Sequence, residues 1–197
     1  MKVLISSDLR YAAKSALEII TRESARSFGT VANIKVSGSN AELVATDGFR
    51  LLIYPVRLCE PVSEVTSFQI SHETLKVLAK VKDSLTVFEV QVENGIGELS
   101  FGDRHAKLTF RLSQVKFPNY ESVIQPTYFD PTNEVYLNPF YMDLGSIFPK
   151  TTKQVEMIRR GNDLIEFTSR DIASDRDIRY FVVGMKQDKH YQKQASK

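Results

Sequence analysis

The strongest constraint on the fold is an order of predicted elements that occurs three times along the chain. Each unit has a strand, an amphipathic helix and three further strands. Unit one has its helix at residues 8–22, where apolar side chains recur at helical spacing: Leu9, Ala13, Ala16, Leu17 and Ile20. Its strands are predicted at residues 3–6, 30–36, 42–46 and 51–56. The turn at Asp47-Gly48 is typical of a hairpin between the last two strands.

Units two and three repeat this order. Unit two has predicted strands at 67–70, 85–92, 98–101 and 106–112, and a helix that follows the N-cap Ser71 and ends near residue 82. Unit three has predicted strands at 134–137, 154–158, 164–168 and 179–183, and a helix at 138–148 that opens with Asn138-Pro139. The repeated βαβββ order indicates an α+β fold rather than a parallel βαβ fold.

The odd number of units has a consequence for assembly. One helix on a small antiparallel sheet leaves open edges, whereas two units joined edge to edge make a credible domain. Units one and two can pair within the chain, and unit three then has no internal partner. We therefore expect its apolar helix face to be uncovered and to pair with unit three of a second copy, through Leu144, Ile147 and Phe148.

Charge limits how this chain could contact nucleic acid. The formal net charge is +2, and the tail at 187–197 holds three lysines and one aspartate, so the rest of the chain is formally neutral. Any contact with a polyanion must then come from local cationic faces. The candidates on the first two helices are Arg10, Lys14, Arg22, Lys76 and Lys80. The alternative is that these side chains form ordinary solvated helix faces.

The remaining composition argues against catalysis. No histidine has a Ser or Cys nucleophile with which to form a triad, and the aspartates between 171 and 177 lack the spacing of a calcium loop. We expect no enzyme, no metal and no cofactor. The single cysteine, Cys59, excludes a disulfide framework and favours a reducing compartment, and no apolar run is long enough to cross a membrane. The expected location is the cytoplasm.

Two segments narrow the fold further. Residues 45–51 read Ala-Thr-Asp-Gly-Phe-Arg-Leu, and residues 116–124 read Lys-Phe-Pro-Asn-Tyr-Glu-Ser-Val-Ile. They resemble the Ala-Thr-Asp-Gly-His-Arg-Leu and Phe-Pro-Asp-Tyr-x-x-Val-Ile segments of the bacterial sliding clamp family, the β subunit of DNA polymerase III. Residues 137–141 and 180–186 are similar to two further segments of that family. Phe49 stands where the family has histidine.

The resemblance implies an abbreviated clamp. Residues 1–126 match the family's middle domain and residues 133–186 the second half of its third domain, followed by a polar tail at 187–197 that we expect to be disordered. Members of this family do no covalent chemistry, encircle duplex DNA and tether polymerases and other proteins that carry short peptides of Gln-Leu-x-Leu-Phe type. A clamp loader is a further implied partner, and a membrane is not.

Residue-by-residue comparison implies where such a peptide would bind. The implied cleft is formed by Thr46, Gly48, Phe49, Arg50, Leu51, Pro118, Val123, Asn138, Tyr141, Phe181, Val183 and Met185. Two functions remain open. One is a processivity factor that closes a ring as a homo-oligomer, a dimer or a tetramer. The other is a peptide-binding adaptor or decoy that never encircles DNA.

Overall fold

The computed structural model describes residues 2–81, 87–101, 106–124, 135–160, 163–171 and 175–184. Its elements in units one and two are β1 (Lys2–Ile5), α1 (Leu9–Leu17), η1 (Ser27–Thr30), β2 (Val31–Ser37), β3 (Asn40–Thr46), β4 (Arg50–Arg57), β5 (Thr66–Ser71), α2 (His72–Ala79), β6 (Phe88–Glu93), β7 (Ile96–Phe101) and β8 (Ala106–Arg111). Those that follow are η2 (Tyr120–Ser122), η3 (Pro139–Met142), α3 (Leu144–Ile147), β9 (Glu156–Arg159), β10 (Leu164–Asp171) and β11 (Arg176–Val183).

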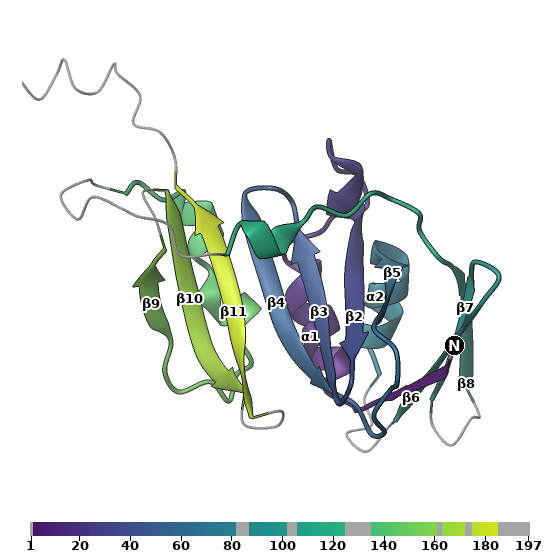
Figure 1. The fold of residues 1–197 in the computed structure, drawn as a ribbon. Coiled ribbons are helices and arrows are strands. Elements are labelled where there is room, and N and C mark those ends of the chain that lie inside the picture. Colours follow the sequence, from purple (N-terminus) through teal and green to yellow (C-terminus); the bar gives the residue numbers. More distant parts are fainter. Residues whose placement is uncertain are drawn as a thin grey trace, which may run out of the picture.

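Units one and two exchange their first strands. β1 of unit one pairs with β6 of unit two in a four-stranded sheet of order β1-β6-β7-β8. β5 of unit two pairs with β2 of unit one in the larger sheet. Helices α1 and α2 pack against each other, and α1 also packs on β3 and β4 (Figure 1). The exchange covers one edge of β2 and one of β6, which ties the two units together.

Unit three continues the sheet of unit one instead of standing alone. β11 pairs antiparallel with β4, with Phe181 opposite Leu51, and completes a seven-stranded sheet of order β5-β2-β3-β4-β11-β10-β9 (Figure 1). The expectation that unit three has no partner within the chain is therefore wrong. β4 is buried along nearly its whole length, because strands flank both of its edges and its side chains pack into hydrophobic clusters on both faces of the sheet.

The predicted oligomer face of unit three is also wrong. Ile147 and Phe148 are 2% and 5% exposed and belong to the main hydrophobic core, and Leu144 packs against that core. Helix α3 contacts α1 of the same chain. The face is covered internally because the β4–β11 pairing brings α3 beside α1.

The helix and first strand of unit three differ from the prediction. The segment 138–148 forms a 3₁₀ turn and the short α3, separated at Asp143, whose ψ of 73° is not helical. The strand predicted at 134–137 is not formed in residues 135–137, where only Tyr136 makes an isolated β-bridge. Residue 134 lies outside the described residues. The helix of unit one ends at Leu17 rather than at residue 22. No helix in the described part of the chain is long and apolar enough to cross a membrane.

A second, smaller core lies on the face of the seven-stranded sheet opposite the helices. It contains Val44, Leu51, Ile53, Tyr120 and Phe181, with Phe117, Ile124 and Leu164 packed against it. The segment that carries η2 crosses this face (Figure 1), and the Tyr120 hydroxyl donates to Glu42 Oε1 at 2.5 Å. This hydrogen bond fixes the η2 segment on β3, where it packs on Leu51 and Phe181.

Candidate functional site

The turn between β3 and β4 is held by the side chains of Thr46 and Asp47. One carboxylate oxygen of Asp47 accepts the backbone N–H groups of Phe49 and Arg50, at 2.8 and 2.7 Å. The other accepts the Arg50 Nε–H at 2.8 Å. The Thr46 hydroxyl donates to the Arg50 carbonyl oxygen at 2.6 Å. Gly48 has a φ of +90°, a conformation that favours glycine. The turn therefore presents Phe49 outward, with 49% of its surface exposed.

Three segments that are distant in sequence meet beside this turn. The Val183 N–H donates to the Phe49 carbonyl oxygen at 2.8 Å. The rings of Phe49 and Tyr141 are nearly parallel, with centroids 6.5 Å apart. The hydroxyl of Tyr180 donates to the Tyr141 carbonyl oxygen at 2.9 Å. The structure thus brings together Gly48, Phe49, Arg50, Tyr141 and Val183 of the implied cleft.

Two arginines lie over the aromatic rings of this surface. The guanidinium of Arg26 is 4.8 Å from the Phe49 ring centroid and donates to the Asp47 carbonyl oxygen at 3.4 Å. A Cβ on Gly48 would lie 1.5 Å from Arg26 Nη1, so a larger residue at this position would displace the guanidinium. The Arg50 guanidinium is 4.9 Å from the ring centroid of Tyr141. The site therefore combines aromatic faces with delocalised cations.

Sequence reasoning missed Arg26 and Phe140. Phe140 is 76% exposed, and its ring lies 5.9 Å from that of Tyr141. Phe140 lies at the start of the amphipathic helix predicted at 138–148, and this position only weakly indicates that its side chain is exposed. Nothing in the local sequence around Arg26 indicates its contact with Phe49, because the contact depends on the tertiary fold.

The other implied residues take different positions. Leu51 and Phe181 are 6% and 1% exposed beneath the η2 segment, so they support the surface from below and do not line an open cleft as predicted. Thr46 is buried in the turn. The Asn138 Oδ1 accepts the Phe140 N–H at 3.0 Å and caps η3. Pro118 and Val123 flank Tyr120, with Val123 48% exposed, and Met185 lies outside the described residues.

Two buried phenols lie at this junction. Burial raises the pKa of Tyr180 above its ordinary value, against the opposing effect of the nearby Arg50 guanidinium. Burial, helped by the hydrogen bond to Glu42, also raises the pKa of Tyr120. Both groups remain protonated near neutral pH, so each hydroxyl acts as a donor that fixes a neighbouring segment.

The predicted cationic helix faces are only partly present. Lys14, Lys76 and Lys80 are exposed on or beside α1 and α2. Arg22 and Lys76 lie 4.0 and 3.9 Å from Glu73, which reduces their net charge. The prediction that Arg10 lies on an open face is wrong: it is 8% exposed, and its Nη2 donates to the Tyr11 hydroxyl at 2.7 Å.

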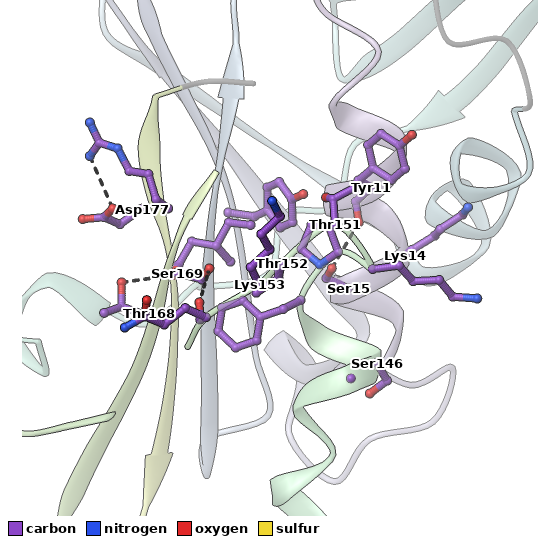
Figure 2. A pocket seen from close by; sticks show the side chains of 18 of the residues that line it. Tyr11, Lys14, Ser15, Ser146, Thr151, Thr152, Lys153, Thr168, Ser169 and Asp177 are labelled. Carbon is purple, nitrogen blue, oxygen red and sulfur yellow. Dashed lines mark hydrogen bonds and ion pairs between the residues drawn. The ribbon is translucent and has the colours of Figure 1, made fainter. Parts of the chain in front are cut away.

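A cavity of about 1200 Å³ lies between α1 and unit three (Figure 2). Tyr11, Lys14 and Ser15 of α1 face the loop 150–153 and the strand residues Thr168 and Ser169 across it. Lys14, Lys150 and Lys153 line this cavity, and none has a carboxylate within ion-pair distance among the residues described. The lining of this seam between units one and three also includes four carboxylates, those of Asp8, Glu18, Glu156 and Asp177. The loop lysines were not among the predicted contacts. In the described ranges, no cluster of His, Cys, Asp or Glu could hold a metal ion.

Comparisons with known proteins identify the fold. No protein-family model matches the sequence, and no curated protein is detectably similar to it. Among solved structures, a putative DNA polymerase III β subunit from Eubacterium rectale superposes with a TM-score of 0.75 at 10% identity, over 94% of this chain and 65% of that one. The β subunit from the DNA polymerase of Streptococcus pyogenes gives a TM-score of 0.69 at 11% identity, over 95% of this chain and 65% of that one.

A third solved structure matches over nearly its whole length. The PCNA of A. fulgidus, solved with the C-terminal region of FEN-1 bound, gives a TM-score of 0.61 at 8% identity, over 95% of this chain and 99% of that one. The chain spans less than two thirds of the length of the two bacterial β subunits. The predicted α+β clamp fold, and the resemblance to an abbreviated bacterial sliding clamp, are confirmed at the level of fold.

Proposed function

We propose that this protein is a sliding clamp, a non-catalytic processivity factor that encircles duplex DNA as an oligomeric ring in the cytoplasm. In this role it tethers a DNA polymerase and other proteins through short peptide motifs, and a clamp loader places it on DNA. The observation that carries the proposal is the meeting of the 46–51, 138–141 and 181–183 segments at the β4–β11 junction of a clamp fold.

The chemistry of this junction suits a short peptide with apolar and aromatic anchors. Phe49, Phe140 and Val183 are exposed apolar groups on a rigid backbone. Exposed apolar surface of this kind marks interaction sites, and aromatic residues are enriched among the residues that dominate binding energy. The guanidinium of Arg26 lies over Phe49 and has no carboxylate partner in the described ranges. It would favour an acidic residue beside the peptide's anchor.

The proposed DNA contacts lie on the helix-covered face of the seven-stranded sheet. Helices α1 and α2 both pack on that face, and Lys14, Lys76 and Lys80 are exposed there. Lys150 and Lys153 extend this group across the seam beside α3. Lysines contact phosphate without reading base sequence, which fits a protein that slides along a duplex.

Retention on DNA circles tests encirclement. The full chain would be incubated with its cognate loader, or at high protein concentration without it, on nicked circular DNA and on the same DNA after linearisation. A ring is retained on circles after a high-salt wash and is lost from linear DNA through the ends. Equal loss from both forms would contradict encirclement.

The adaptor is a second candidate, favoured by a specific observation. The β4–β11 pairing covers the helix face of unit three within one chain, and the described residues of the proposed peptide surface all come from that chain. Peptide binding by a protein that stays monomeric and is not retained on circles would establish this alternative.

A further inference from the structure

The cavity between α1 and unit three is separate from the proposed peptide surface, since Phe49, Phe140, Tyr141 and Val183 do not line it (Figure 2). Its volume of about 1200 Å³ is large enough for a cofactor-sized ligand, because pockets that hold such ligands measure roughly 300–1,000 Å³. An apolar base with a few polar groups around it is the usual composition of a small-molecule site. This cavity has both, and the chemistry of its walls indicates which ligand it fits.

The apolar part of the lining belongs to the main core. Tyr54, Phe148 and Ile178 are 1%, 5% and 1% exposed, and they form the inner end of the cavity. Leu17 of α1 and Pro149 are half-buried beside them. A flat, weakly polar ring system that covers these side chains would be favoured by the removal of apolar surface from water.

Donor groups for an anion stand on both walls of the cavity. Lys14 lies on α1, and Lys150 and Lys153 lie on the loop that faces it. Thr151 and Thr152 are between the two loop lysines, and their hydroxyl groups are further donors. Ammonium and hydroxyl groups are common partners of phosphate oxygens. Because the lysines come from two elements, an anion with two or three linked phosphates matches them better than a single phosphate ion does.

The carboxylates of the lining restrict the choice further. Two of them, Asp8 and Asp177, are neutralised by arginines whose nitrogen atoms lie 2.9 and 3.3 Å away. Glu18 and Glu156 have no cationic side chain within ion-pair distance in the described ranges. An ionised carboxylate only accepts hydrogen bonds, so these two groups repel a simple polyphosphate and fit a ligand that also carries hydroxyl or amino donors.

We propose that this cavity binds a nucleoside di- or triphosphate. The lysines of the two walls and the threonine hydroxyls bind the phosphates. Glu18 and Glu156 accept hydrogen bonds from ribose hydroxyl or base amino groups, and the base covers the apolar inner end. A nucleotide thus supplies a partner for each kind of group in the lining: the ammonium groups, the free carboxylates and the apolar side chains.

This site goes beyond the proposed function, because it requires neither a ring nor a partner protein. Lys14 and Lys150 also belong to the proposed DNA face, so the phosphate backbone of a duplex is the competing explanation for their charge. A duplex backbone would contact the lysines and leave the free carboxylates and the apolar inner end without a partner. The experiment must therefore separate a free nucleotide from DNA.

Calorimetric titration of the full chain, free of DNA, tests the site. The probes are the four ribonucleoside triphosphates, inorganic triphosphate and adenosine, each alone. At least one nucleotide should saturate a single site per chain and bind more tightly than inorganic triphosphate. Lys14→Ala with Lys153→Ala should weaken that nucleotide about tenfold or more. Lys107→Ala with Lys116→Ala removes the same charge from residues outside the cavity and should leave the affinity unchanged.

Two further variants separate nucleotide binding from general attraction. Glu18→Ala with Glu156→Ala should raise the affinity for inorganic triphosphate and lower that for the nucleotide, so that the preference for the nucleotide falls by about threefold or more. A purely electrostatic role would raise both affinities. Thr151→Trp fills part of the cavity from an exposed position without changing its charge, and should abolish nucleotide binding.

Several outcomes would overturn the proposal. One is the absence of saturable binding by any of the four nucleotides up to about millimolar concentration. Another is equal affinity for nucleotide and inorganic triphosphate, and a third is an equal loss in the control pair. If Lys14→Ala with Lys153→Ala weakens only a duplex oligonucleotide, these lysines serve DNA and the site is wrong. Should that variant fail to fold, as judged by its thermal unfolding, Thr151→Trp decides.

Discussion

Val183 donates its backbone N–H to the carbonyl oxygen of Phe49 at 2.8 Å. This bond lies just beyond the paired residues of β4 and β11, where Arg50 is opposite Val182. It extends the ladder into the Asp47-Gly48 turn, so that the position of Phe49 depends on unit three. The candidate peptide surface is therefore a property of the junction between units one and three and not of either unit alone.

Glu166 should be among the residues on which the packing of β9, β10 and β11 in unit three depends most. It is 1% exposed and forms ion pairs with Arg160 and Arg179. Glu166→Ala leaves two partly buried guanidinium groups without this carboxylate, which should lower the free energy of unfolding by about 3–5 kcal/mol. Urea denaturation of the purified variant measures the loss. Glu64→Ala, at an exposed loop position, is the control and should change stability by less than about 0.5 kcal/mol.

Alkaline pH should destabilise the fold through Tyr120 and Tyr180. An unfolded tyrosine loses its proton near the ordinary pKa of a phenol, 10.0, whereas burial raises the pKa of both phenols in the folded chain. Above that pH the unfolded state binds fewer protons than the folded state. The free energy of unfolding should then fall by up to roughly 1.4 kcal/mol per pH unit for each phenol.

Urea denaturation between about pH 9 and about pH 11 measures this slope. Tyr120→Phe removes one of the two phenols and should make the slope shallower. Its stability at neutral pH reports the separate loss of the hydrogen bond to Glu42. An unchanged slope in this variant would mean that Tyr120 ionises equally in the folded and unfolded chains.

Much of units one and two could be predicted because their signals are local. Asp47-Gly48 and Asn94-Gly95 mark hairpin turns, and Gly48, Asn94 and Gly95 all adopt positive φ values. Ser71 accepts the backbone N–H of Thr74 and begins α2 as an N-cap residue should. These features depend on a few adjacent residues and need no knowledge of the tertiary fold.

The β4–β11 pairing could not be predicted from such local signals. Residues 51–56 of β4 are almost all apolar, a pattern that indicates burial on both faces but does not identify the neighbouring strand. The burial of Ile147 and Phe148 follows from that pairing, so it was missed for the same reason. Arg10 was assigned to an open helix face, but its guanidinium lies 4.5 Å from the Tyr11 ring centroid, where the two residues cover each other.

DNA affinity should depend on salt through the exposed lysines. Each phosphate contact contributes about 0.9 to the negative slope of log affinity against log salt concentration. Replacing Lys14 and Lys150 by alanine should reduce the slope by about 1.8 if both contact phosphate. Fluorescence anisotropy with a duplex of mixed sequence, over a range of salt concentrations, gives the slope. Lys76→Ala with Lys80→Ala tests α2 in the same way.

The control for these variants removes the same charge elsewhere. Lys107 and Lys116 are exposed, and Lys107 lies on β8, away from the two helices. Their double alanine variant lowers the net charge equally. If it flattens the salt slope as much as the helix variants do, the attraction depends on total charge and the proposed DNA face is wrong.

A peptide of Gln-Leu-x-Leu-Phe type should bind at the β4–β11 junction through Phe49 and Val183. Val183 is 36% exposed, and its backbone is fixed to that of Phe49. Val183→Asp would place a charge against apolar anchors of the peptide and should weaken binding at least about a hundredfold, since an unpaired carboxylate is costly to desolvate. Val65→Asp, at a 68% exposed position in the β4–β5 connection, is the matched control and should bind normally. Calorimetric titration measures both affinities.

Arg26→Ala should separately reduce the preference for a peptide with an acidic residue beside its aromatic anchor, while leaving the affinity for a neutral peptide within about threefold. Equal losses for the two peptides would place Arg26 in a structural role, as a support for Gly48 and Phe49, and normal binding by Val183→Asp would exclude this junction as the peptide site.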